Sequence, residues 1–320
     1  MRDRLTPDVE QYARITRLAL VAFTLIVLTG AAVRVTGSGL GCPTWPKCTN
    51  DALYTQLKLH GVIEFGNRVL TSVVTLAALA ALVGAIRRKP YRKDLVVLAA
   101  MLPLGVVAQI VLGGFTVLYK LAPGFVMSHF LLSMLILVAC VTLDWRAHHE
   151  RGEQSATVTP ADRTLVRGAW ALLPLGTLTI FAGTAATAAG PLAGGAGTGN
   201  VIKRLHFKGA DTLHFIVEQH ARLATLLGLA AVALWFVARR RGIGAAERTP
   251  LTALCVLLAL QGAVGALQYA LHLPAEIVWV HVTLAAATWV ALLWTVAAAR
   301  RFEARPAHAR GTHGEAAPAR

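Results

Sequence analysis

Charged residues are scarce in this 320-residue chain, at 15%, whereas hydrophobic residues make up 56%. Such a composition excludes a soluble globular domain of ordinary make-up. The charged residues that are present leave long uncharged stretches between them, and each stretch is long enough to cross a hydrocarbon layer of about 30 Å. The sequence therefore predicts a protein that crosses the membrane several times.

The uncharged stretches predict eight transmembrane helices and no other kind of regular structure. They cover approximately Thr16–Val35, Gly61–Ile86, Leu95–Tyr119, Gly124–Leu143, Gly168–Ala189, Leu213–Ala238, Leu251–Ala270 and Glu276–Ala299. The first stretch has no small-residue cleavage site behind it and is too long for the apolar core of a signal peptide, so we expect it to be retained as a helix.

Acidic residues are also few, which leaves a net charge of +15. A nucleic-acid partner is not expected, because the basic residues are distributed by side of the membrane. Of the 31 Lys and Arg, 22 lie on one side, in segments 1–17, 87–94, 144–167, 239–249 and 300–320. This asymmetry predicts a multi-pass protein of the cell membrane with both termini in the cytoplasm and the lipid bilayer as its surroundings. The tail 301–320, rich in Ala, Arg, His and Pro, is predicted to be disordered.

Cysteine is rare, with four residues in all. Cys42 and Cys48 lie in the first outer loop, where an oxidising compartment permits a disulfide. Cys140 and Cys255 fall within helices, and we interpret them as small buried hydrophobic residues. The matching outer loop of the second half, Gly190–Thr212, contains no cysteine. A second disulfide is therefore excluded there.

The two halves of the chain repeat at an offset of about 153 residues. The matched pairs, in chain order, are Gly30 with Gly183, His60 with His214, Glu64 with Glu218, Arg68 with Arg222, Gln109 with Gln261, Gly113 with Gly265, and His129 with His281. Four helices per half is an even number, so the halves are expected to be related by a pseudo-two-fold axis along the membrane normal. We predict two tandem four-helix bundles, residues 1–150 and 151–300.

Three histidines lie inside predicted helices at similar depth. His129 and His281 follow prolines at the starts of helices 4 and 8, and His220 comes early in helix 6. At 1.5 Å per residue, each lies roughly 10 Å below the outer edge of the hydrocarbon. A hydrogen-bonded core histidine is the alternative interpretation of each one taken alone. Ionisable side chains are costly at this depth unless they face the bundle interior and have a partner there.

His220 and His281 belong to the same half, and paired histidines on facing helices are how helical bundles hold heme. A single metal ion is less favoured, because no carboxylate or cysteine lies in register to complete its ligand set. The sequence therefore favours a heme bound by these two histidines.

The second predicted helix carries a polar face formed by His60, Glu64, Asn67 and Arg68. The last three residues follow His60 by four, seven and eight positions, so all four share one side of a helix. Glu64 lies one turn inside the membrane, where a carboxylate is costly and is a functional candidate. Desolvation would keep it protonated until a partner charges it, which suits a general acid or base. A structural ion pair with Arg68 is the alternative. Arg68 and its repeat partner Arg222 can each neutralise a heme propionate or a carboxylate, or simply extend to the membrane surface.

These residues together resemble the heme A synthase family. The resemblance rests on segment 36–48, which reads Thr-Gly-Ser-Gly-Leu-Gly-Cys-Pro-Thr-Trp-Pro-Lys-Cys, on segment 63–68, and on one histidine each in helices 4, 6 and 8. It extends from about Leu18 to Trp294, which is nearly the whole chain.

The resemblance implies an oxidoreductase that converts a methyl group of heme O to a formyl group and so makes heme A for cytochrome oxidase. It implies a heme b cofactor held by His220 and His281. The N-terminal half is then expected to receive heme O, with Glu64 as the catalytic residue. Cys42 and Cys48 are implied to form a disulfide, redox-active or structural, near the heme-binding face.

The sequence departs from the family's Glu-x-x-His-Arg motif at Asn67, which stands at the histidine position. Asparagine is a poor ligand for heme iron, so we expect the substrate iron on His129, with His60 as the alternative second ligand. In the second half, one residue separates His220 from Arg222, where the family has the pair adjacent. Glu64 would either stabilise positive charge at the oxidised methyl carbon or deprotonate the attacking water or oxygen species.

Two other functions are compatible with parts of the pattern. A di-heme electron carrier of the b type predicts two equivalent bis-histidine sites, which Asn67 disfavours. A transporter predicts that Glu64 and the histidines relay protons and that no heme is bound. The sequence leaves open whether a heme O synthase delivers the substrate, whether the redox partner is a thiol–disulfide protein or a quinone, and whether the chain forms a homo-oligomer.

Overall fold

The computed structural model describes residues 6–53, 58–149, 162–195, 199 and 201–299. Within these residues the chain is helical and has no strand, and eight helices are long and apolar enough to cross a membrane. They are α1 (Val9–Val35), α2 (Leu59–Arg87), α3 (Lys93–Leu118), α4 (Pro123–His148), α5 (Arg163–Ala189), α6 (Thr212–Arg240), α7 (Ala245–Ala270) and α8 (Ala275–Ala299), with a short 3-10 helix, η4 (Gly209–Asp211), before α6. The predicted all-α membrane fold is confirmed.

Several helices extend beyond the apolar runs because polar residues cap them. α1 begins at Val9 rather than Thr16, since the side chain of Asp8 accepts a 2.8 Å hydrogen bond from the backbone N–H of Gln11 and the Gln11 side chain accepts one in return. This reciprocal cap satisfies backbone donors that the helix start leaves free. Asp162 likewise caps α5, which begins at Arg163 rather than Gly168.

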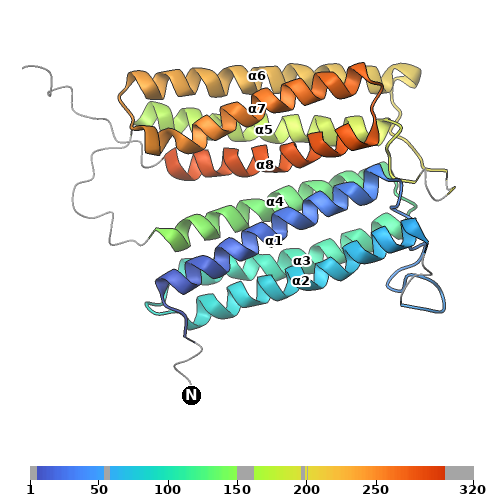
Figure 1. Cartoon of the computed structure of the whole chain (residues 1–320), viewed down its shortest axis with the longest axis horizontal. Coiled ribbons are helices and arrows are strands. Elements are labelled where there is room, and N and C mark those ends of the chain that lie inside the picture. The colour runs from blue at the N-terminus through green and yellow to red at the C-terminus, as the bar shows by residue number, and fades with distance from the viewer. Residues whose placement is uncertain (1–5, 54–57, 150–161, 196–198, 200, 300–320) are drawn as a thin grey trace, which may run out of the picture.

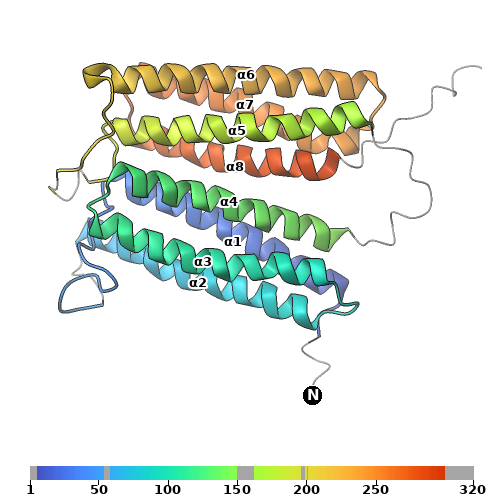
Figure 2. The ribbon, with the colours of Figure 1, turned by 180° about the vertical axis from the view of Figure 1, so that it is seen from behind.

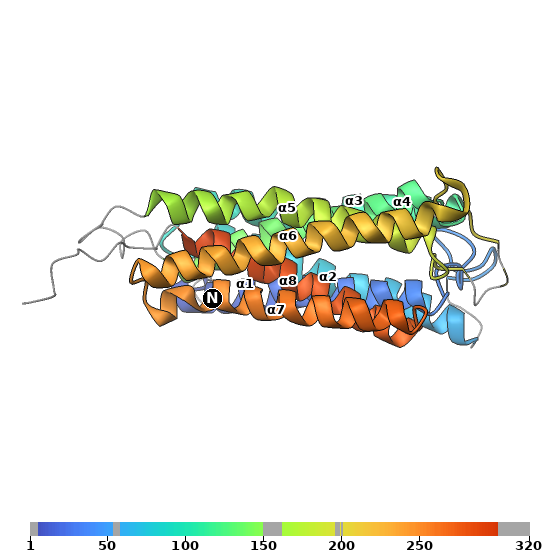
Figure 3. The same ribbon diagram turned by 90° about the horizontal axis from the view of Figure 1, so that it is seen from above.

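Each half forms its own four-helix bundle. In the first half α1 packs against α2 and α4, and α3 packs between α2 and α4; α5 to α8 repeat this arrangement. The halves meet where α8 packs against α1 and α4, and where α4 packs against α5. Figures 1 and 2 show the two bundles stacked, and Figure 3 shows their helices running along one common axis.

The contacts between the halves have the symmetry that the duplication predicts. If α1 corresponds to α5 and α4 to α8, then the α1–α8 contact corresponds to the α5–α4 contact, and α4 and α8 meet at the axis. Trp289 of α8 reinforces this central contact by donating a 2.9 Å hydrogen bond to the carbonyl of Met134 in α4. The arrangement agrees with two tandem four-helix bundles related by a pseudo-two-fold axis.

The repeat also appears in the backbone of the turns that join α3 to α4 and α7 to α8. Lys120 and Leu121 have positive φ values of 49° and 57°, and His272 and Leu273 have φ values of 62° and 64°. Leu121 donates its N–H to the carbonyl of Thr116 at 2.7 Å, as Leu273 does to Gln268 at 2.8 Å. Non-glycine residues seldom adopt this conformation, so its occurrence twice at matching positions supports a common origin of the halves.

The described connections between helices lie at one of two ends of the molecule (Figure 1). The disulfide end, as we call it here, carries residues 36–53, 119–122, 190–195 and 201–211. The opposite, terminal end carries the start of α1 and the end of α8. Large side chains such as Leu18, Leu76, Leu104 and Leu229 are at least 65% exposed on the helix surfaces, as expected where lipid replaces water. The predicted disordered tail 301–320 and the predicted domain limit at residue 150 lie outside the described residues.

Candidate functional site

The loop after α1 is closed by a disulfide between Cys42 and Cys48, whose Cα atoms are 4.3 Å apart and whose side chains are fully buried. The disulfide expected from the sequence is thereby confirmed. The loop folds over α3, where a Cβ atom on Gly114 would lie only 2.9 Å from the indole of Trp45. Gly114 therefore allows the loop to lie against the helix.

Glu64 of α2 lies directly beneath this loop and is 7% exposed. Its Oε2 accepts a 2.7 Å hydrogen bond from the backbone N–H of Cys42, and its Oε1 accepts one of 2.7 Å from Arg68. The sequence left two states open, a carboxyl kept neutral by desolvation and an ion pair with Arg68. The structure contains the ion pair, which favours the charged carboxylate.

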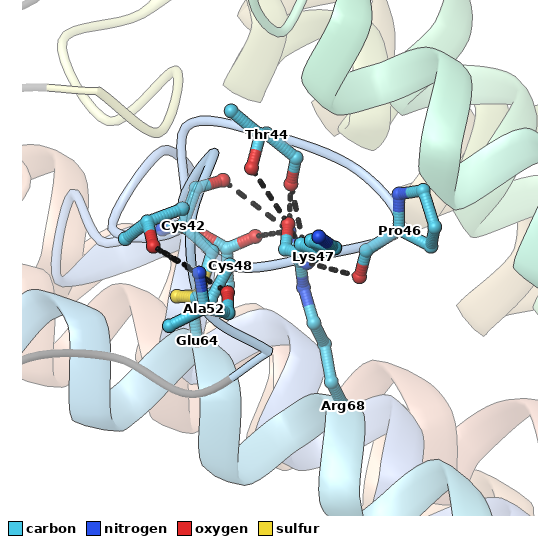
Figure 4. Close-up of a disulfide and its surroundings, with 9 residues drawn as sticks. Cys42, Thr44, Pro46, Lys47, Cys48, Ala52, Glu64 and Arg68 are labelled. Carbon is cyan, nitrogen blue, oxygen red and sulfur yellow. Dashed lines mark hydrogen bonds and ion pairs between the residues drawn. A yellow bond between two sulfur atoms is a disulfide. The ribbon is translucent and has the colours of Figure 1, made fainter.

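Arg68 connects the same carboxylate to the rest of the loop (Figure 4). Its guanidinium also donates to four loop carbonyls, those of Cys42 at 3.2 Å, Thr44 at 3.2 Å, Lys47 at 3.3 Å and Pro46 at 3.4 Å. A guanidinium has several donors in a rigid fork, so one arginine can hold several carbonyls at once. We call Glu64, Arg68 and residues 42–48 the loop clasp.

His60 lies at the first turn of α2, beside the start of the loop. Its Nδ1 is 2.9 Å from the hydroxyl of Ser38, which is itself 2.8 Å from the hydroxyl of Thr36. The backbone of Gly41 passes so close to the carbonyl of His60 that any Cβ would overlap it. Among the described residues, no hydrogen bond or ring contact joins His60 to His129, so the structure does not bring these two predicted ligands together.

His129 points from α4 toward α3. Its ring lies against Gly113, where a Cβ atom would be 3.2 Å from His129 Cε1, and its Nδ1 is buried without a hydrogen-bond partner. Gln109 of α3 fixes the backbone nearby by donating a 3.1 Å hydrogen bond to the His129 carbonyl. Asn67 accepts a 2.8 Å hydrogen bond from Thr29 of α1. The first half therefore holds one partly buried histidine with a buried ring nitrogen, together with an amide that is already engaged.

The second half contains a facing histidine pair. The rings of His220 in α6 and His281 in α8 lie 6.2 Å apart between centroids, with an interplanar angle of 75°. Nδ1 of His220 is 2.9 Å from the carbonyl of Thr179 in α5, which leaves Nε2 unoccupied by this bond. The side-chain nitrogen of Gln261 donates a 3.0 Å hydrogen bond to the His281 carbonyl, as Gln109 does to the His129 carbonyl.

Two glycines create the space that these rings occupy. A Cβ on Gly183 of α5 would be 2.9 Å from Cε1 of His220, and one on Gly265 of α7 would be 3.1 Å from Cε1 of His281. The sequence identified Gly183, Gly265 and Gly113 as repeat positions but did not explain them. Their role is steric, because each faces a histidine on a neighbouring helix. At Gly30, which matches Gly183, a Cβ would have no atom within 4 Å.

The ion pair of α2 recurs in α6 between Glu218 and Arg222, but its surroundings differ. The side chains of Glu64 and Arg68 are 9% and 23% exposed, whereas those of Glu218 and Arg222 are 46% and 65% exposed. No loop residue described in the second half bonds to Glu218. Of the two repeated pairs, the one in the first half is buried and bound to a loop.

Comparison with known proteins agrees with this arrangement. The chain is similar to heme A synthases from Lysinibacillus sphaericus, with 30% identity over 126 residues, and from Alkalihalophilus pseudofirmus, with 26% over 145 residues. These matches cover 39% and 45% of this chain and 41% and 48% of the relatives, so the chain spans about half the length of the curated relatives it matches. A protoheme IX farnesyltransferase from Thermus thermophilus is 37% identical over 67 residues, which is 21% of this chain and 11% of that protein.

The most extensive match is to a protein family. Residues 13–293 match the sequence profile of COX15-CtaA, described as cytochrome oxidase assembly protein, and so include all eight membrane helices almost completely. With the duplicated bundle and the buried histidines, this match establishes that the chain belongs to the COX15-CtaA family of cytochrome oxidase assembly proteins.

Proposed function

We propose that the protein is a heme A synthase, an oxidoreductase that converts a methyl group of heme O to a formyl group and thereby makes heme A. The observation that carries the proposal is the asymmetry of the repeat. One half has a facing histidine pair and an exposed ion pair, whereas the other has a single partly buried histidine and a carboxylate held under a disulfide loop. A division into a cofactor half and a substrate half accounts for this difference. The family and the names of the relatives support it.

The second half suits a heme b held by His220 and His281. Two imidazole nitrogens, each about 2 Å from one metal ion, leave ring centroids about 6 Å apart, and the observed separation is 6.2 Å. The bond from His220 to a backbone carbonyl is the usual support for a metal-binding histidine. When bound, heme supplies one-electron transfer. Arg222 stays a predicted propionate ligand, beside its partner Glu218.

The first half is proposed to receive heme O as substrate, with His129 as the iron ligand and His60 as the alternative second ligand. His129 offers a buried nitrogen without a partner. Glu64 is the proposed catalytic residue. Both of its oxygens already accept hydrogen bonds, one of them from Arg68. This arrangement favours stabilisation of positive charge at the oxidised methyl carbon over removal of a proton.

The protein is proposed to lie in the cell membrane with both termini in the cytoplasm, as its basic residues predict. The disulfide end would then face an oxidising compartment, in which Cys42 and Cys48 persist as a disulfide. A heme O synthase is the proposed source of substrate, and the similarity to a protoheme IX farnesyltransferase supports this link. A thiol–disulfide protein or a quinone is the proposed redox partner.

Heme analysis of a complemented strain tests the proposal. A strain lacking its own heme A synthase receives the wild-type gene or E64Q, and extracted hemes are identified by chromatography and mass spectrometry. We expect heme A with the wild type and none, or accumulated heme O, with E64Q. E218Q is the matched control, because it alters the repeat partner of Glu64, and it should still yield heme A. Heme A at wild-type level with E64Q would contradict the catalytic role, and heme b alone with the wild type, in a host that makes heme O, would favour an electron carrier.

A further inference from the structure

Arg34 is a partly buried cation at the disulfide end that neither the loop clasp nor the histidine pair uses. It lies in the last turn of α1 and continues the buried stripe formed by Phe23, Val27 and Ala31. Its Nε is shielded from solvent and has no hydrogen-bond partner. Among the described residues, none forms a hydrogen bond or ion pair with its guanidinium, whereas Arg68 has five acceptors.

The surroundings of Arg34 are formed by both halves of the chain. The loop after α5 reaches back over the first half, where the N–H of Gly39 donates a 3.0 Å hydrogen bond to the carbonyl of Gly194. Gly194 has a φ of +119°, and a Cβ there would lie 3.2 Å from Leu121 and 3.5 Å from Cγ of Arg34. The stem of Arg34 is therefore enclosed by a glycine loop and an apolar side chain, neither of which offers a negative charge.

A guanidinium whose Nε is buried without an acceptor is costly at the edge of a membrane. A bound anion would remove that cost, because arginine forms paired hydrogen bonds with a carboxylate. The repeat shows that the cation is specific to the first half. The matching position in α5 is Thr187, whose hydroxyl bonds to the carbonyl of Gly183 in its own helix.

The depth of Arg34 suits a carboxylate on a ligand held by His129. α1 ends at Val35 and α4 begins at Pro123, both at the disulfide end. His129 lies six residues into α4, so it is about 9 Å deeper than the start of that helix. A porphyrin carries its propionate carboxylates at its rim. With the iron bound to His129, the distance from the iron to these carboxylates is comparable to that difference in depth. Among the described cations at the disulfide end, Arg34 alone has a buried side-chain nitrogen without a hydrogen-bond partner.

We propose that Arg34 binds a propionate carboxylate of the porphyrin held in the first half. This inference rests on the proposed function, since it needs a porphyrin there. Arg34 orients the substrate through its propionate edge, while His129 holds the iron. The second half has Thr187 at the matching position, so this particular contact belongs to the first half alone.

The test compares two porphyrins on the purified full-length protein in phosphatidylcholine nanodiscs, with the second-half site already filled with heme b. Ferric protoporphyrin IX and its dimethyl ester are titrated separately, and the dissociation constants come from the change in Soret absorbance. We expect the wild type to bind the free acid about tenfold more tightly than the ester, the factor typical of one charge-assisted hydrogen-bond contact. R34Q should bind the ester as the wild type does but lose the preference for the acid. R14Q changes an exposed arginine of the same helix and should keep the preference.

The outcomes separate the two proposals. A full preference in R34Q, or none in the wild type, would overturn the role of Arg34 and leave the proposed function intact. Failure of the wild type to bind either porphyrin would contradict the proposed function itself. Should R34Q fail to assemble, R34K decides in its place. A lysine keeps the charge but not the paired donors, so a reduced preference supports the contact and an unreduced one overturns it.

Discussion

The backbone N–H of Cys42 donates a 2.7 Å hydrogen bond to Oε2 of Glu64, so the disulfide loop and the buried carboxylate hold each other in place. Arg68 completes the arrangement by bonding both to Glu64 and to the carbonyls on either side of the loop. A carboxylate in this position cannot move without disturbing the loop. The chemistry proposed for Glu64 and the integrity of the disulfide are therefore coupled.

Replacing Arg68 with methionine should expose the disulfide to reductants. The substitution removes six hydrogen bonds to five acceptors from the clasp but keeps a side chain of similar length. Because hydrogen bonds to charged groups are individually strong, we expect reduction by dithiothreitol to be about tenfold faster. Trapping the free thiols with a maleimide measures the rate. R222M, at the exposed repeat position, should reduce at the wild-type rate, and equal rates for R68M and wild type would refute the clasp.

Removing either histidine of the facing pair should abolish heme b binding in the second half. H220A and H281A each leave a single imidazole, which cannot supply both axial ligands. Purified variants should lose the low-spin spectrum of bis-histidine heme, as recorded by absorption spectroscopy. H214A is the control, because His214 lies on the same helix but bonds to Tyr269 at 3.1 Å. Retention of the low-spin spectrum in both H220A and H281A would exclude the pair as the ligand set.

Filling the space beside His220 should weaken the same site without removing a ligand. In G183A the added Cβ would lie 2.9 Å from Cε1 of His220, so the ring or α5 must shift. Such overpacking costs about 1–3 kcal/mol, and we expect lower heme b content and a lower Tm. G30A adds the same atom at the matching position of the first half, where a Cβ has no atom within 4 Å. An equal effect of the two substitutions on heme b content would contradict this steric account.

Asp162 at the terminal end should give stability a dependence on acid pH. Burial opposes its ionisation, but hydrogen bonds from Arg241, Leu165 and Thr164 outweigh that effect and lower the pKa of Asp162 below its usual range. A pKa lowered by folding means that the unfolded state binds more protons at acid pH. The contribution of Asp162 to the free energy of unfolding is therefore present above about pH 5. It is lost as the pH falls below the usual value of about 3.9 toward the folded pKa.

Two variants separate the charge of Asp162 from its cap. D162N keeps a capping residue and D162A loses it, so the free energy of unfolding of D162A should be about 1 kcal/mol lower than that of D162N. Thermal unfolding in detergent at pH 7 and at pH 4 measures both effects. The Tm difference between wild type and D162N should shrink at the lower pH, and a difference that grows would show that the sign is wrong.

The helices could be predicted because a membrane helix must be apolar along its whole length, and the duplication could be recognised from residues at constant spacing. Helix ends were less predictable. α4 continues from Leu143 to His148 and α7 begins at Ala245 rather than Leu251, since charged residues at the terminal end extend these helices beyond the hydrocarbon. The sequence could predict that His220 and His281 face each other, because they lie at matching depth on two helices of the same half.

The clasp could not be predicted in the same way. Arg68 binds backbone carbonyls, and since every residue has one, the sequence does not show which of them an arginine will contact. Glu64 and Arg68 stood at the spacing of an ion pair, but only the fold of residues 42–48 shows which face of the pair is covered. Arg34 appears in the sequence as one of several basic residues near helix ends. Gly194 lies against the Arg34 side chain but is far away in the sequence, and because a glycine has no side chain, no residue type predicts this contact.

The hydrogen bond between Gly39 and Gly194 also sets an order of events during synthesis. The two residues are 155 positions apart (194 − 39), and a ribosome adding about 5–20 residues per second needs roughly 8 to 30 seconds to make the second after the first. In that interval the first loop has only its local partners, among them Glu64 and Arg68. The newborn first bundle can therefore close its disulfide before the second bundle arrives, and the link between the two bundles is made last.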